Sequence, residues 1–404
     1  MAAARVNIPL SNLRAAVIVI VVAFHSVLPY LASQPASPFQ FDAAPYRWVA
    51  FPIIDRERFF GFDLFCAWQD VSLMSLMFFL AGLFTPASLK RKGSLQFLID
   101  RWWRIGLPFC LAAAILSPLA YYAAYRTTAA DPSLGAFWQH WLALPMWPAG
   151  PAWFLWQLFF FSALVSVMHW VAPQSLRALD RFMGRFDDRP AGFFFLLVAL
   201  SAVAYVPLAL GYSAWDWDSR GPFAFQISRP LLYLLYFFTG IAIGSHGLDR
   251  GLAKSDGPLA RHWLGVLALA VASFFLWGEL TSLTLPDWNA SPLPARLAAA
   301  LAFPLACAAG VLSLFTMALR RLNFPHRALD SLSANAYGIY LVHYVVVVWV
   351  QYAILEVALP AVAKGVIVLG LALPVSWGVS AGLRAFFPLL ARLGSRDALL
   401  QQRR

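Results

Sequence analysis

Residues 13–31, LRAAVIVIVVAFHSVLPYL, form an apolar run interrupted by one arginine, Arg14, and one histidine, His25. A helix of this length crosses the hydrocarbon core of a bilayer, which is about 30 Å thick. Runs of similar length recur through the 404-residue chain, of which 61% is hydrophobic and only 12% charged. Soluble domains carry about 25% charged residues. The sequence therefore predicts an all-α, polytopic membrane protein.

Ten apolar runs are long enough to span a bilayer, and we expect them to form one helical bundle in a single membrane domain, residues 1–404. Because the count is even, both termini are predicted on the same side of the membrane. The predicted spans lie near residues 13–31, 66–86, 105–124, 153–172, 191–211, 229–246, 262–284, 296–319, 334–357 and 364–388.

The placement of the thirty Lys and Arg residues predicts the orientation. With the amino terminus in the cytoplasm, twenty-two of them fall on the inner side and eight on the outer side. This excess follows the positive-inside rule, so both termini are predicted to be cytoplasmic. The net charge of +11 then reflects loops at the membrane surface, with lipids as partners, and does not call for a nucleic-acid partner.

Two features flank the first apolar run. A basic start before it and the small residues of LASQPAS after it also fit a signal peptide, but a histidine inside the run favours a retained span. The outer loop that follows, about residues 32–65, mixes prolines with Phe39, Phe41, Trp48 and Phe51. This composition predicts a packed or interfacial lid rather than a flexible linker.

Ionisable groups inside membrane spans are costly and often mark functional sites, so Arg14 and His25 are candidates for chemistry. They are eleven residues apart, which in an α-helix places them within about 20° of one face and about 16 Å apart along the axis. Arg14 is then at the cytoplasmic mouth and His25 near the middle of the membrane. An imidazole can take a proton from an alcohol, as acyl transfer requires. The alternative is a histidine that only hydrogen-bonds a neighbouring helix.

A pair of arginines, Arg101 and Arg104, stands three residues apart in DRWWRIGLP, where the third span begins on the inner side. Residues three apart share a helix face, and guanidinium groups suit phosphates. The phosphates belong either to a bound coenzyme or to lipid headgroups. The residues alone do not choose between these two interpretations.

Two acidic residues and a polar stripe complete the candidates inside the spans. Asp70 and Glu279 either orient His25 or bind a sugar hydroxyl, or each pairs with an arginine for structural reasons. The stripe in SLSANAYGIYLVHY is predicted to line a substrate path, or else to form hydrogen bonds between helices. Its members are Ser333, Asn335, Tyr337, Tyr340 and His343.

Several catalytic classes are disfavoured. No two histidines have the i, i+3 or i, i+4 spacing of a helical metal site, and neither a G-x-S-x-G nor a Walker pattern is present. The three cysteines lie in or beside separate apolar runs, which suggests neither a disulfide nor a zinc site. We expect no metal and no permanently bound cofactor.

Five segments, in this order, carry a resemblance to a known family. They are NLRAAVIVIVVAFH, with an Arg, ten residues and a His; SLMSLMFFLAGLFTPASLKRKG; FLIDRWWRIGLP, with Arg-x-x-Arg; GPAWFLWQLFFF; and SANAYGIYLVH. Over most of its length the chain resembles the integral membrane acyltransferase family 3, and especially the members that modify periplasmic glucans. The opening NLRAA differs from the family's usual opening of an acidic residue, Ser, Leu, Arg and Gly.

The resemblance implies an acyltransferase of a bacterial inner membrane that takes acetyl-CoA or succinyl-CoA from the cytoplasm as its donor substrate. The acyl group would pass to a hydroxyl of an envelope or periplasmic carbohydrate. The resemblance also implies a catalytic role for His25 and Arg14, and binding of acyl-CoA by Arg101 and Arg104. Direct transfer and a two-step route through an acylated His25 are both compatible with the sequence.

Two other functions fit ten spans as well. A carrier or flippase for a sugar or a lipid-linked substrate would use similar polar stripes, although the chain lacks the matched, Gly- or Pro-interrupted halves typical of transporters. A scaffold that has lost catalysis is disfavoured by the presence of both Arg14 and His25. The sequence leaves a homo-oligomer open.

Overall fold

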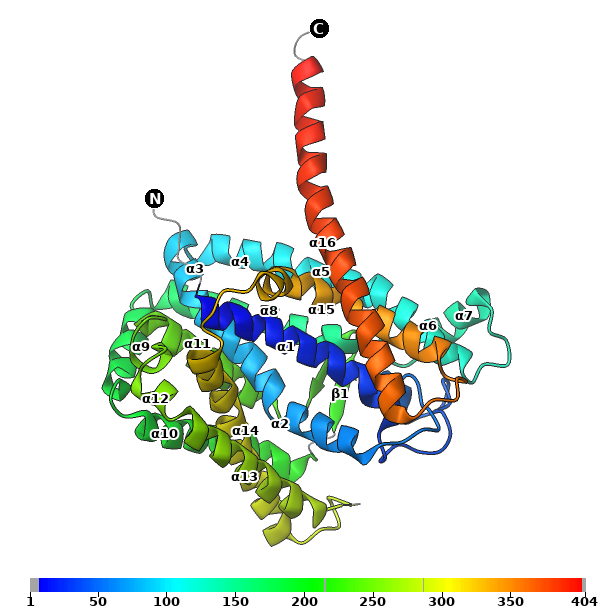
Figure 1. Ribbon diagram of the computed structural model, residues 1–404, viewed down its shortest axis with the longest axis horizontal. Helices are drawn as coiled ribbons and strands as arrows, with labels where there is room; N and C mark the ends of the chain where they lie inside the picture. The colour runs from blue at the N-terminus through cyan, green and yellow to red at the C-terminus, as the bar shows by residue number, and fades with distance from the viewer. Residues whose placement is uncertain (1–6, 214–215, 286, 402–404) are drawn as a thin grey trace. The chain divides into compact units, whose positions relative to one another are not determined.

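The structure is a computed structural model that describes residues 7–213, 216–285 and 287–401 (Figure 1). Side chains are described as far as residue 386. Within these residues, nine helices are long and apolar enough to span a membrane, and a bent helix pair would make a tenth. Each of the nine overlaps a span predicted from the sequence. The expected all-α, polytopic membrane architecture is confirmed.

The chain divides into two compact units, which are described separately. The first unit takes the residues up to Leu13, then Leu64–Ala114 and Leu144–Pro325. Its elements are most of α2 (Phe60–Leu83), then α3 (Thr85–Lys92), α4 (Ser94–Arg101), the π-helical turn η3 (Trp102–Gly106), α5 (Leu107–Leu111), η5 (Gly150–Ala152), α8 (Trp153–Val171), α9 (Ser175–Met183), η6 (Gly184–Phe186), α10 (Pro190–Gly211), β1 (Trp217–Arg220), β2 (Phe223–Gln226), α11 (Pro230–His246), η7 (Gly251–Ala253), α12 (Pro258–Arg261), α13 (Trp263–Ser282) and α14 (Leu293–Arg321). Within this unit α10 and α13 pack on α14, α11 packs on α9, and α4 packs on α8.

The second unit takes Arg14–Asp63, Ile115–Ala143 and the chain from His326 onward. Its elements are α1 (Ile8–Val27) from Arg14 on, η1 (Leu28–Tyr30), η2 (Arg47–Val49), α6 (Ser117–Arg126), α7 (Leu134–Ala143), α15 (Arg327–Ala353) and α16 (Ala361–Gln401). A π-helical turn, η4 (Ala112–Leu116), contains residues of both units. In the second unit α15 packs along α16 and also on α6.

Prolines mark where several helices begin. The helices α10, α11 and α12 start at Pro190, Pro230 and Pro258. Proline suits the first position of a helix because its backbone dihedral is already helical and its missing N–H would have no partner there. Pro190 and Pro230 lie within one residue of the predicted starts of two spans, at 191 and 229.

The predicted span at residues 229–246 is a short helix with a bend after it. The 17 residues of α11 reach about 26 Å, slightly less than the hydrocarbon core. Gly247 then adopts φ +125°, which ends the helix, and the following segment Gly251–Arg261 is bent by 95° from it. The sequence showed the apolar length of this span but not the change of direction.

Close backbone contact joins α2 and α11 in the first unit. A Cβ on Gly240 would come within 2.1 Å of the Phe79 carbonyl oxygen, and one on Gly244 within 2.1 Å of the Leu83 carbonyl oxygen. Gly82 has the reciprocal position against Phe237. Small residues four apart allow such contact between membrane helices, and dispersion then replaces the hydrophobic effect as the force that joins them.

A hairpin that the sequence did not predict lies between α10 and α11. Strands β1 and β2 pair antiparallel, with Arg220 opposite Phe223. The two-residue turn between them begins with Gly221 at φ +59°, the left-handed region that such turns require. The strands have four residues each, too few to give a clear alternating pattern in the sequence.

The aromatic loop, residues 31–59, is packed against its own unit, as its composition predicts. Phe41 and Trp48 are buried and stack with ring centroids 4.3 Å apart. The Tyr121 hydroxyl of α6 donates a 2.6 Å hydrogen bond to the Val49 carbonyl oxygen. At the far end of the loop, Asp55 forms a fully buried ion pair with Lys364 of α16, with Oδ2 and Nζ 2.7 Å apart.

Candidate active site

The candidate site is built on His25, close to the point where α1 gives way to the 3-10 turn that contains Pro29. Nδ1 of His25 lies 2.9 Å from the carbonyl oxygen of Val21, one turn earlier in the helix. A carbonyl oxygen only accepts hydrogen bonds, so this contact assigns the ring proton to Nδ1. The side chain is partly exposed.

Helix α15 brings a second histidine, His343, against the first. His343 is fully buried, and its Nε2 lies 3.2 Å from Nδ1 of His25. Its own Nδ1 lies 2.7 Å from the carbonyl oxygen of Tyr340, which assigns the proton of this ring to Nδ1 as well. Nε2 of His343 is therefore an acceptor that faces the Nδ1–H of His25.

These tautomers leave one nitrogen of the pair for chemistry. The described residues form hydrogen bonds with Nδ1 of His25, and its Nε2 keeps an unprotonated lone pair. That lone pair can take a proton from a hydroxyl group or attack an acyl carbon. His343 stands behind His25 in the place of the orienting group of a base–orienter pair.

Gln351 of α15 forms a hydrogen bond with the backbone of His25. Its Nε2 donates a 2.7 Å hydrogen bond to the carbonyl oxygen of His25, and the side chain is buried. The rings of Phe24 and Tyr344 meet the His25 ring edge-on, with centroids 4.9 and 5.3 Å away. Both the ring and the backbone of His25 are thus held in place, as a reactive group requires.

Arg14 lies on the same helix as His25. The helix is continuous from Ile8 to Val27, so the spacing of eleven residues from Arg14 to His25 makes about three turns and places both on one face. The Arg14 side chain is exposed. Its assignment to the site rests on this shared helix and stays a prediction.

Asn12 gives a physical reason for the unusual opening of this helix. Its side chain is fully buried, and Nδ2 donates to the carbonyl oxygens of Leu322 (2.7 Å) and Phe324 (2.8 Å). These carbonyls follow the end of α14, where a helix leaves carbonyl groups without partners. Aligned on Leu13 and Arg14, Asn12 takes the place of the family's serine; a serine hydroxyl has a single proton and could not donate both bonds, so an amide is suited to this position.

Arg101 and Arg104 belong to the first unit. Arg101 ends α4, where it lies 4.9 Å from the centre of the Phe97 ring and donates to Thr85 Oγ1 at 3.4 Å. Arg104 is exposed, inside the π-helical turn η3, which is wider than an α-helical turn and spreads residues three apart around the axis. Their role in binding acyl-CoA stays a prediction.

Asp70 pairs with an arginine, which is the structural alternative stated for it. Its Oδ1 and Oδ2 accept bonds of 2.9 and 2.6 Å from Nη1 and Nη2 of Arg229, which is fully buried. Arg229 Nη1 also donates to the Asp70 carbonyl oxygen at 3.1 Å. This bidentate pair lies in the first unit. A role for Asp70 in a substrate path stays a prediction.

The other predicted residues are divided between the units. Glu279 is exposed near the carboxyl end of α13, in the first unit. On α15, Ser333 and Tyr340 are buried together with His343, whereas Tyr337 is 42% exposed. At 100° per residue, Tyr337 is rotated about 40° from Ser333 in one direction around the helix axis, and His343 about 80° in the other direction. Tyr337 therefore lies at the edge of the buried face.

Sequence reasoning missed two features of this site. It placed His343 on a substrate path and did not pair it with His25, because helical spacing says nothing about which helices become neighbours. Gln351 was not singled out, although a lone glutamine in the apolar run VVVVWVQY was a detectable signal.

A known protein family matches most of the chain. No curated protein and no solved structure matches it. The acyltransferase-3 family, described as an acyltransferase domain, matches residues 8–381. This range includes Arg14, His25, His343 and Gln351, together with all or most of each candidate membrane-spanning helix in the described part of the chain. The chain therefore belongs to the acyltransferase-3 family and is an integral membrane acyltransferase.

Proposed function

We propose that this enzyme moves an acyl group, acetyl or succinyl, from cytoplasmic acyl-CoA to a hydroxyl of an envelope or periplasmic carbohydrate, with His25 as general base. The observation that carries the proposal is the contact between His25 and His343. The Nδ1–H group of His25 donates to its partners in this contact, so the proton is on Nδ1 and Nε2 is unprotonated. A histidine with only a packing role would have no need of a buried orienting partner.

In the direct route, the acceptor hydroxyl gives its proton to Nε2 of His25 while its oxygen attacks the thioester carbon. The new ester bond forms, the carbon–sulfur bond breaks, and the coenzyme thiolate takes the proton back from the imidazolium. In the two-step route, Nε2 attacks the thioester carbon, the carbon–sulfur bond breaks and the coenzyme thiolate leaves. The acceptor oxygen then attacks the acyl carbon, the carbon–nitrogen bond to Nε2 breaks, and the hydroxyl proton neutralises the thiolate. Incubation with labelled donor and no acceptor separates the routes, because only the second accumulates acylated His25.

The donor site is proposed at the cytoplasmic side. Arg101 and Arg104 would bind the coenzyme phosphates, since guanidinium groups form bidentate hydrogen bonds with phosphate oxygens. Arg14 would assist at the inner end of α1. This assignment follows from the proposed orientation, with both termini cytoplasmic in a bacterial inner membrane.

The test is transfer of label from acyl-CoA to an envelope glycan by wild type and by His25→Ala. General-base catalysis contributes about 10²–10⁴-fold, so the variant should lose at least that factor. The matched control is His262→Ala, because Nδ1 of His262 also lies near the carbonyl oxygen four residues earlier, at 2.7 Å, but its side chain is exposed. Equal labelling by all three proteins, each folded by detergent chromatography, would remove His25 from the mechanism.

A further inference from the structure

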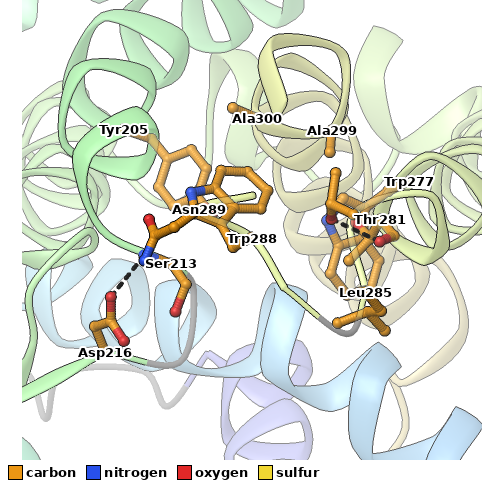
Figure 2. Close-up of a pocket in the computed structure, with 11 residues that line it drawn as sticks. Tyr205, Ser213, Asp216, Trp277, Thr281, Leu285, Trp288, Asn289, Ala299 and Ala300 are labelled. Atoms are coloured by element: carbon orange, nitrogen blue, oxygen red, sulfur yellow. Dashed lines mark hydrogen bonds between the residues drawn. The ribbon is translucent and has the colours of Figure 1, made fainter. Parts of the chain in front are cut away.

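The first unit contains a cavity that is lined by none of the residues assigned above. It has a volume of about 190 Å³ and is bounded by α10, α13 and α14 with the two segments that follow α10 and α13. Figure 2 shows Ser213 and Asp216 approaching it from the segment after α10, and Trp288 and Asn289 from the segment after α13. Both segments belong to loops that the charge distribution predicts on the outer side.

The aromatic wall of the cavity is held rigidly from behind. Tyr205 stacks on Phe303 with ring centroids 4.4 Å apart, and Trp277 meets the same ring edge-on at 5.8 Å. The guanidinium of Arg229 lies 4.9 Å from the centre of the Phe303 ring, and its fork is bound to Asp70. Tyr205 and Trp277 are both more than nine-tenths buried. A preformed wall loses little conformational entropy when a ligand binds.

Two buried polar atoms of the cavity lining have no hydrogen-bond partner among the described residues. They are Trp288 Nε1 and Thr281 Oγ1. A buried donor or hydroxyl without a partner is costly, so a polar ligand at this position would be favoured. Asp216 accepts one bond, from the Ser213 backbone N–H to Oδ2 at 2.8 Å.

The lining selects a class of ligand by its chemistry. It combines aromatic faces with a carboxylate, an amide and hydroxyls, and no lysine or arginine is among the described residues that line it. Without a cation the cavity is unsuited to phosphate and therefore to acyl-CoA. A lipid chain would leave the polar groups unpaired. A sugar ring offers C–H faces to the aromatic rings and hydroxyls to the polar groups.

We propose that this cavity binds one pyranose ring of a neutral carbohydrate. Its volume is below the ~300–1,000 Å³ of sites for drug-sized ligands, which limits the occupant to about one ring. The remainder of a longer glycan would extend outward past the two loops. The proposal deepens the proposed function, which takes a carbohydrate as acceptor, but the binding does not depend on acyl transfer and is measured without it.

In the experiment, the full-length protein in lipid nanodiscs is titrated with neutral disaccharides of glucose, galactose and N-acetylglucosamine, and calorimetry measures the binding. Alkyl maltoside detergents are avoided because their head group is itself a disaccharide. We expect at least one disaccharide to bind wild type. Trp288→Ala should weaken that binding about tenfold through loss of an aromatic contact. Asp216→Asn, an exposed change that leaves the fold intact, should weaken it about threefold or more.

Two controls separate this proposal from the catalytic one. Trp170→Ala removes an exposed tryptophan of α8 away from the cavity and should bind sugar like wild type. His25→Ala should also bind sugar like wild type even if it has lost acyl transfer. Failure of all disaccharides to bind wild type would overturn the proposal, as would unchanged binding by both Trp288→Ala and Asp216→Asn. Displacement of bound sugar by laurate in wild type and in Trp170→Ala alike would identify a lipid site in the cavity and overturn the proposal as well.

Discussion

Replacing His343 by Phe tests whether the second histidine positions the first. The change keeps an aromatic ring in a fully buried position but removes the Nε2 acceptor that lies 3.2 Å from Nδ1 of His25. Among the described residues, the His25 ring then keeps only the Val21 carbonyl oxygen as a hydrogen-bond partner. Loss of the partner that orients a metal-bound histidine costs about 10–100-fold in activity, and by analogy we expect the same factor here, ~1.4–2.7 kcal/mol of transition-state stabilisation. We expect kcat to fall by that factor while KM for both substrates stays the same.

The assay measures initial rates of label transfer by purified protein over a range of donor and acceptor concentrations. His343→Gln serves as the conservative variant, because its side-chain carbonyl oxygen can accept a hydrogen bond close to the position of Nε2. It should recover at least part of the lost kcat. Detergent chromatography and thermal stability establish that each variant is folded.

Two results would refute the reasoning. Wild-type kcat in His343→Phe would mean that His25 needs no partner at Nδ1. A raised KM for the carbohydrate at constant kcat would mean that His343 contacts the acceptor, as its place in the polar stripe first suggested. Neither result is compatible with a purely positioning role.

Two further predictions concern the donor site and the start of α1. Removing both arginines in Arg101→Ala with Arg104→Ala should weaken acyl-CoA binding about 100-fold, because each charge-assisted hydrogen bond to phosphate contributes ~1.5 kcal/mol or more; isothermal calorimetry measures this. Asn12→Asp should lower the free energy of unfolding by about 1–3 kcal/mol for each carbonyl left without a donor after α14; the midpoint of denaturant unfolding measures it.

Each of these predictions has a matched control in the chain. Lys90→Ala with Arg91→Ala removes two exposed cations from α3 and should leave acyl-CoA affinity unchanged. Equal loss of acyl-CoA affinity in both double variants would mean that Arg101 and Arg104 act only by general electrostatic attraction. Asn7→Asp keeps the side-chain oxygen that accepts the Leu10 N–H and gives up only the long 3.4 Å bond from Nδ2 to the Leu248 carbonyl oxygen, so it should destabilise the protein much less than Asn12→Asp does. Equal stability of the Asn7 and Asn12 variants would contradict the account of Asn12.

The membrane architecture followed from the sequence because apolar length is a one-dimensional property. A run such as residues 13–31 must pair its backbone groups internally in lipid, so it forms a helix whatever its neighbours are. Features that depend on local backbone angles were not accessible in this way. The bend after α11 depends on Gly247, and the hairpin before it depends on the turn at Gly221.

The candidate site was predictable along a helix but not between helices. Periodicity placed Arg14 and His25 on one face of α1, and the structure retains that spacing. The contact of His25 with His343 joins residues 318 positions apart, and the Asp70–Arg229 pair joins residues 159 apart. No spacing rule reaches across such distances, because the choice of neighbouring helices depends on packing of the whole bundle.

The paired histidines limit how many protons the site can hold. Both Nδ1–H groups face backbone carbonyls, which cannot move away without unwinding α1 or α15. Nε2 of His25 can accept one proton, but a second proton would have to enter at Nε2 of His343 and bring two N–H groups together at 3.2 Å. The site therefore stores a single proton and must empty before it can work again. In the proposed direct route one hydroxyl proton is taken and one is returned to the departing thiolate, so the His25 ring is neutral again at the end of each cycle.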